Sequence, residues 1–203
     1  MKLSNFLKWP AAIALLPCLA MATTTHRFGA FGDTLEDAKK TDFFKFFHMA
    51  ETGRADAGGC ETIRFQPSGP QFHDLVILNV EVVGGHIGAA TLHLKRSFID
   101  SHDEAFARDI AASFLGHALS DETDTEARNL IAQIRNDYRG EVMVISGPGA
   151  DRKVPLPLTP EYMVFLGQSV QGNGSFNYMD ISLTNTTTRG RELQIRVEPA
   201  RRK

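Results

Sequence analysis

Residues 75–95 read LVILNVEVVGGHIGAATLHLK, and this stretch decides the fold class. Its first half, Leu75 to Val83, is too rich in valine and isoleucine for a surface helix and predicts a strand. Gly84 and Gly85 follow directly, and two glycines between two apolar runs indicate a tight hairpin turn, because such turns need positive φ angles. The run from His86 to Lys95 then predicts the returning strand of an antiparallel hairpin.

The register of this hairpin predicts which side chains share a face of the sheet. Without a bulge, one face pairs Val82 with Ile87, Val80 with Ala89, Leu78 with Thr91 and Val76 with His93, whereas the other face pairs Ile77 with Leu92 and Leu75 with Leu94. The end away from the turn is then apolar on both faces. We therefore expect helices to cover one face there, and another layer, chain or ligand to cover the other.

Three helices are predicted around the hairpin. The first begins at Asp33 or Thr34, whose side chains suit a helix N-cap. The second runs from about His102 to Leu119, with apolar side chains four residues apart, and the third begins near Thr123 or Asp124 and ends at Gly140. The last two helices are expected to form a helical hairpin that lies against the sheet.

Beyond Gly140 the pattern returns to strands. The expected strands are a segment from Glu141 to Ser146, a short apolar run from Tyr162 to Leu166, and two alternating segments at 179–184 and 193–197. Strands, then helices, then strands again favour an α+β fold over a doubly wound nucleotide-binding fold. The sequence thus predicts an α+β domain with a mainly antiparallel sheet, a central helical hairpin packed on one face and an N-terminal helix.

The domain organisation follows from the first residues of the chain. Residues 1–22 carry a positive head, an apolar run and the Ala20-Met21-Ala22 pattern of a signal peptide, so we predict cleavage between Ala22 and Thr23. An alternative is acylation of Cys18, although Pro17 replaces the small residue that normally precedes a lipidated cysteine. Residues 23–32 are expected to form a flexible arm, and residues 33–203 a single domain that is exported to the periplasm or outside the cell.

Charge and cysteine content restrict the partners of the processed chain. Removal of Lys2 and Lys8 leaves 20 basic against 24 acidic residues, a formal net charge of −4 that does not suit binding to nucleic acid. Cys60 then remains as the single cysteine, so no intramolecular disulfide is expected, and burial is the favoured state of its thiol. The apolar run of the leader is too short for a transmembrane helix, and no later segment is long enough. The sequence does not predict the oligomeric state.

A dense aromatic cluster marks the first predicted helix. Phe43, Phe44, Phe46 and Phe47 fall within five residues, so they cannot all face one narrow stripe of a helix. Packing in the core is the favoured interpretation, and contact with a membrane or a partner is the alternative.

No motif predicts a catalytic, cofactor-binding or metal site. The segment from Asp100 to Glu104 has four possible metal donors, but acidic residues at the start of a helix are explained by the helix dipole. The segment from Gly167 to Gly172 resembles a nucleophile elbow around Ser169 but has one residue too many, and no helical pattern follows it.

Two function classes remain after this comparison of motifs. The favoured hypothesis is a non-catalytic exported module that binds a hydrophobic small molecule, a membrane surface or a protein partner. The sequence shows more apolar segments than one sheet face needs, and it shows no set of polar residues that would meet in one site. The alternative is a small exported hydrolase built from His73, His102 or His117 with an acid or Ser169.

Overall fold

The computed structural model describes residues 27–119, 124–137, 158–176, 178–186 and 191–200, together with the backbone of strands at 142–145 and 152–155. The expected signal peptide, its cleavage site at Ala22 and Thr23, and residues 23–26 of the expected arm lie outside the described residues.

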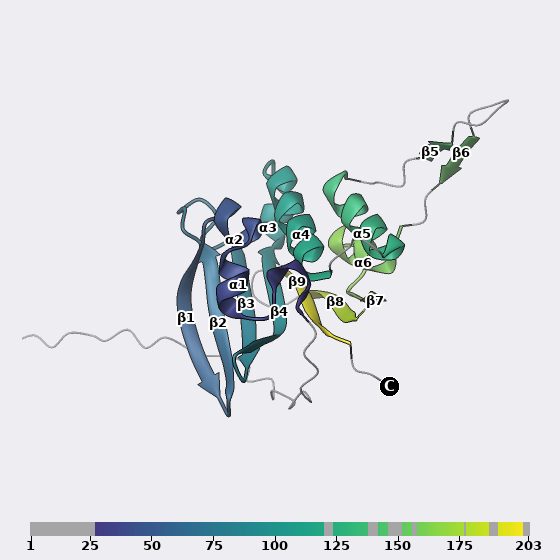
Figure 1. Ribbon diagram of the computed structural model, residues 1–203. Coiled ribbons are helices and arrows are strands. Elements are labelled where there is room, and N and C mark those ends of the chain that lie inside the picture. Colours follow the sequence, from purple (N-terminus) through teal and green to yellow (C-terminus); the bar gives the residue numbers. More distant parts are fainter. Residues whose placement is uncertain are drawn as a thin grey trace, which may run out of the picture.

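A seven-stranded sheet forms the centre of the molecule, and every neighbouring pair of its strands is antiparallel. The strand order is β1-β2-β3-β4-β9-β8-β7, so the C-terminal strand β9 lies beside β4 (Figure 1). The strands are β1 (Met49–Ala57), β2 (Cys60–Pro67), β3 (Val76–Val83), β4 (His86–Lys95), β7 (Gln171–Phe176), β8 (Met179–Thr186) and β9 (Glu192–Pro199). A separate two-stranded ribbon pairs β5 (Val142–Ile145) with β6 (Arg152–Pro155). The α+β class and the antiparallel sheet are as the sequence predicts.

The β3–β4 hairpin has its predicted glycine turn but a different register. Gly84 and Gly85 have φ angles of +58° and +88°, in the left-handed region that the turn needs. Glu81 lies opposite Ala89 while Val82 lies opposite Ile87, so Gly88 is an extra, bulged residue.

This bulge moves every later side chain of β4 to the opposite face. Leu92 and Leu94 now lie opposite Leu78 and Val76, and all four are buried. The prediction of a hairpin end that is apolar on both faces is therefore wrong, because the bulge collects the large apolar side chains of β4 on a single face.

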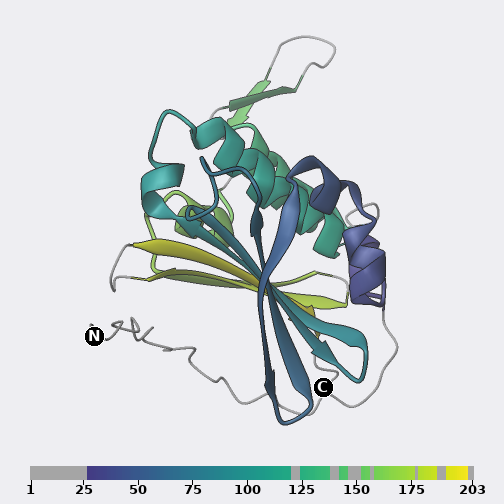
Figure 2. The same cartoon turned by 90° about the vertical axis from the view of Figure 1, so that its left-hand side faces the viewer.

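Helices cover that apolar face of the sheet, as Figures 1 and 2 show. The helices are η1 (Gly29–Phe31, 3₁₀), α1 (Leu35–Lys39), α2 (Asp42–Phe46), α3 (Arg96–Ile99), α4 (Glu104–Leu119), α5 (Thr125–Arg135) and α6 (Pro160–Phe165). The antiparallel pair α4 and α5 is the predicted helical hairpin, with Asp124 capping α5 through the backbone N–H groups of Glu126 and Ala127. None of the described helices is long and apolar enough to cross a membrane.

The N-terminal helix begins as predicted but is divided in two. Thr34 caps α1 and forms a capping box with Asp37. The first helix ends at Lys39, the hydroxyl of Thr41 donates to the carbonyl of Ala38 at 2.6 Å, and α2 starts at Asp42.

The described part of the expected arm is packed rather than loose. Phe28 and Phe31 are 1% and 3% exposed and lie in the core. Between them, Gly29 has a φ of +53° and approaches the last turn of α4 so closely that a Cβ atom there would lie 2.2 Å from the carbonyl oxygen of His117. The two buried phenylalanines hold residues 27–32 against the core, and the flexibility expected of residues 23–32 stays a prediction.

The run from Tyr162 to Leu166, for which the sequence predicts a strand, is helical. Thr159 caps α6 by accepting a hydrogen bond from the backbone N–H of Tyr162, and Pro160 occupies the first helical position. The predicted strand is wrong here, because a run of five apolar residues suits a buried helix as well as a strand.

Cys60 is buried on β2, as the sequence favours. The expectation of a single unpaired cysteine concerns the chain after removal of residues 1–22 and stays a prediction.

Candidate functional site

A cavity of about 360 Å³ lies where α3, the first turns of α4, and α6 meet. Its charged and polar walls are Arg96, Asp100, Glu104, Arg108 and Gln168, and its apolar walls are Ile99, Leu158, Phe165 and Leu166. This volume lies within the range of about 300–1,000 Å³ that small-molecule sites occupy. A mixture of apolar side chains with a few charged groups is also typical of such sites.

Arg108, on α4, joins this helix to the end of α5 and to α6. Its side chain is 5% exposed, and its guanidinium donates to Glu104 Oε1 through both Nε and Nη2, to Asp137 Oδ1, to the carbonyl of Ile134 and to the hydroxyl of Tyr162. Burial lowers the pKa of Arg108, but the hydrogen bonds to Glu104 and Tyr162 outweigh burial and hold the pKa above its ordinary value. These bonds use all five N–H groups of the guanidinium, so Arg108 supports the cavity wall structurally.

Arg96 is placed differently and keeps donors for another molecule. Its Nη1 donates to the carbonyl of Phe165 at 2.6 Å, at the end of α6, and its Nη2 donates to Asp100 at 2.6 Å. Gly167 permits this approach, because a Cβ atom there would lie 3.0 Å from Nη2. The other three N–H groups of Arg96 have no partner among the described residues, although its side chain is only 11% exposed.

The predicted cluster from Asp100 to Glu104 contributes to this cavity rather than to a metal site. Asp100 pairs with Arg96 and Glu104 pairs with Arg108, while the side chain of His102 is 92% exposed. Across the described part of the chain, no group of three or more histidine, cysteine, aspartate or glutamate side chains is placed to hold a metal ion.

Most of the apolar side chains that the sequence left without an assigned place are packed in the core. Phe43, Phe44 and Phe47 are buried, which confirms core packing for these three, and Phe46 alone is 70% exposed. An apolar hollow beneath η1 and α2 has a volume of only about 10 Å³. A space of this size holds about one water molecule, so this hollow cannot take a hydrophobic ligand without movement of the helices.

The sheet face opposite the helices carries two charged clusters. In the first, Arg196 makes a two-pronged contact with Glu81, at 2.5 and 3.0 Å, and also donates to Glu198 at 3.0 Å. Hydrogen bonds to Glu81 raise the pKa of Arg196 and outweigh its burial. In the second, Glu192 contacts His93 Nδ1 and lies 3.6 Å from the ammonium of Lys95.

Burial raises the pKa of Glu192, but the hydrogen bond and charge of His93 and the charge of Lys95 outweigh it, so the pKa lies below its usual value. The other ring nitrogen of His93, Nε2, lies 3.1 Å from the side-chain amide of Asn79. Both ring nitrogens are thus engaged. Residues 93 and 192 are far apart in the chain, and no sequence spacing points to this contact.

The candidate histidines of the hydrolase hypothesis are held in separate places. The Nδ1 atom of His73 lies 3.1 Å from the carbonyl of Pro67 in a loop beside β2. His117 Nδ1 contacts the carbonyl of Ser113 in its own helix, while His102 lies at the surface 3.6 Å from Asp103.

The structure also shows no elbow at Ser169. Ser169 follows α6 in a loop, and its backbone N–H donates to the carbonyl of Met163. The described residues therefore place none of the proposed histidines in hydrogen-bond contact with this serine.

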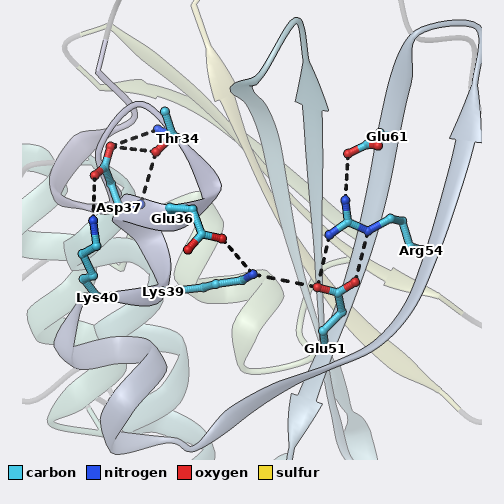
Figure 3. Close-up of polar contacts among 8 residues, drawn as sticks. All are labelled: Thr34, Glu36, Asp37, Lys39, Lys40, Glu51, Arg54 and Glu61. Carbon is cyan, nitrogen blue, oxygen red and sulfur yellow. Dashed lines mark hydrogen bonds and ion pairs between the residues drawn. The ribbon is translucent and has the colours of Figure 1, made fainter.

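A chain of surface ion pairs ties α1 to the sheet edge, as Figure 3 shows. Lys39 lies 3.1 Å from Glu36 and 3.9 Å from Glu51, and Arg54 joins Glu51 to Glu61. Hydrogen bonding to Arg54 is the main reason that the pKa of Glu51 lies below its ordinary value. Because these groups are solvated and satisfy one another, they fix local structure and do not form a ligand site.

Comparison of the chain with known protein families, with curated protein sequences and with solved structures finds no match in any of the three.

Proposed function

We propose that this protein is an exported, non-catalytic binding module that takes a small, partly apolar molecule into the cavity between α3, α4 and α6. The observation that carries the proposal is the combination, in one cavity of about 360 Å³, of the incompletely bonded Arg96 with the half-buried apolar side chains of Leu158 and Leu166. Export is supported by the signal-peptide pattern of residues 1–22.

The geometry favours a small molecule over a membrane surface. The large apolar side chains that are most exposed, Phe46, Val170 and Tyr178, belong to α2, to the loop before β7 and to the turn between β7 and β8. Membrane-binding surfaces need a contiguous apolar patch, whereas these three residues come from separate elements.

The proposal can be tested by native mass spectrometry of the processed protein purified from its own host, followed by extraction and identification of any bound molecule. Leu158→Trp places an indole in the cavity wall and should lower the bound fraction. Val170→Trp is the matched control, because Val170 is 64% exposed and does not line the cavity. Equal occupancy in wild type and Leu158→Trp would contradict binding in this cavity.

The hydrolase hypothesis is an alternative for which the described residues offer no convergent site. It predicts ester or amide hydrolysis that is lost on substitution of a single histidine, and assays of the His73, His102 and His117 variants would test it.

A further inference from the structure

The two arginines of the cavity differ in a way that indicates the class of ligand. Arg108 has all five N–H groups bonded within the protein, whereas Arg96 uses two, one on the carbonyl of Phe165 and one on Asp100. A guanidinium matches a carboxylate with two parallel hydrogen bonds, which are stronger than bonds between neutral groups. Arg96 is therefore the group in this cavity that suits an anionic ligand.

Asp100 occupies one of the positions that a ligand carboxylate would take on Arg96. Its side chain is 60% exposed, and it lies four residues after Arg96 at the rim of the cavity. Water solvates the Asp100 carboxylate well once it leaves Arg96, and the incoming carboxylate keeps the 11% exposed Arg96 side chain paired. An incoming carboxylate that brings an apolar part with it can therefore replace Asp100 at little cost.

The rest of the cavity restricts the charge and shape of that ligand. Glu104 also lines the cavity, where Arg108 holds it, and it would repel a second anionic group. Leu158 and Leu166, which are half-buried, offer apolar surface for a hydrocarbon part. A single carboxylate attached to an aliphatic or aromatic group satisfies both conditions, whereas a phosphate or a dicarboxylate does not.

We propose that the cavity binds amphipathic monocarboxylates, with the carboxylate on Arg96 in the place of Asp100 and the hydrocarbon against Leu158 and Leu166. This inference rests on the proposed function, because it names the ligand class of the same cavity. Asp100 then acts as an internal competitor that weakens binding of the ligand.

Isothermal titration calorimetry with octanoate and with 1-octanol at neutral pH tests the proposal, since the two probes share a hydrocarbon length and differ in charge. Wild type should bind octanoate about tenfold or more tightly than octanol, the scale of one charge-assisted hydrogen bond. Asp100→Asn should tighten octanoate binding several-fold and leave octanol unchanged. Asp180→Asn is the matched control, because Asp180 lies on β8 outside this cavity and should leave both affinities unchanged.

Arg96→Lys keeps the positive charge but removes the pair of parallel hydrogen bonds that a guanidinium offers to a ligand carboxylate. It should weaken octanoate binding and leave octanol binding unchanged. Because Arg96 also contacts the end of α6, circular dichroism must show that Arg96→Lys is still folded. Asp100→Asn tests the proposal independently of this variant, because Asp100 is largely exposed and its substitution should not disturb folding.

Equal binding of octanoate and octanol, or no tightening in Asp100→Asn, would overturn the ligand class and leave cavity binding intact. Absence of binding by either probe would also overturn the ligand class. The proposed function itself is judged separately, by whether the molecule carried by the purified protein is lost in Leu158→Trp.

Discussion

Substitution of Gly29 by alanine should destabilise the protein severely, because Gly29 lies where the N-terminal segment touches α4. Its φ of +53° costs a residue with a side chain about 1–2 kcal/mol. The added Cβ atom would lie 2.2 Å from the carbonyl oxygen of His117 and 2.4 Å from that of Ala118. Both contacts are to backbone atoms, so the segment itself must move by about 1 Å to reach the ordinary contact distance of 3.4 Å.

This movement would expose part of the two buried aromatic rings that flank Gly29. Phe28 and Phe31 flank Gly29 and are 1% and 3% exposed, and full burial of one phenylalanine contributes about 1.5–3 kcal/mol. If about half of the burial of both rings is lost, the total loss with the backbone term is about 2.5–5 kcal/mol, a large part of the stability of about 5–15 kcal/mol that is typical of a domain.

Urea unfolding of the chain from Thr23, followed by circular dichroism, measures this loss. Gly116→Ala is the matched control, because Gly116 is inside α4 and no atom lies within 4 Å of an added Cβ there. Alanine should stabilise this helix by about 0.5–1 kcal/mol. A loss below about 1 kcal/mol for Gly29→Ala would refute the reasoning and show that residues 27–32 form a loose arm.

Three further outcomes are expected. Gly85→Ala should cost about 1–2 kcal/mol in urea unfolding through backbone conformation alone, because an added Cβ meets no atom within 4 Å, and a larger loss would reveal an unrecognised contact. Glu192→Gln should be less stable than wild type at pH 7, because the hydrogen bond from His93 outweighs burial and lowers the folded-state pKa of Glu192. The difference in stability should persist down to about pH 4.5 and disappear as the pH falls through that lower pKa. A difference that persists at pH 2 would contradict this origin. Phe46→Ser should change the unfolding free energy by less than about 0.5 kcal/mol, whereas Phe44→Ala, at a buried ring, should cost about 3–5 kcal/mol, and similar losses for both would mean that Phe46 is packed.

The elements that sequence could predict are those with local signals. The turn at Gly84 and Gly85 needs positive φ, and Asp124 provides an N-cap, so both features appear where local chemistry requires them. The bulge at Gly88 had a signal as well, since an isolated glycine inside a strand suggests a bulge. The pairing of Thr159 with Pro160 likewise indicates a helix start that the short apolar run alone does not show.

The candidate site could not be predicted because its contacts are distant in the chain. Arg96 meets the carbonyl of Phe165, and Arg108 meets Asp137 and Tyr162. Neither arginine belongs to a motif, and the difference between them appears only when the hydrogen bonds of each guanidinium are counted. Sequence reasoning correctly placed Glu104 at a helix start, whereas Asp100 is the C-cap of α3, and it could not identify the arginines that pair with them.

The position of β9 beside β4 determines the order in which the molecule can assemble. The β-hairpin of β3 and β4 forms from neighbouring residues, but the other edge of β4 pairs with Glu192–Pro199, about a hundred residues later. A chain that ends before residue 191 would expose the backbone groups of a central strand rather than those of a short edge, and such an edge promotes aggregation. All seven strands of the sheet are therefore paired only when nearly the whole chain is present. The ion pair between Glu81 and Arg196, which reaches across β4, forms in that last step.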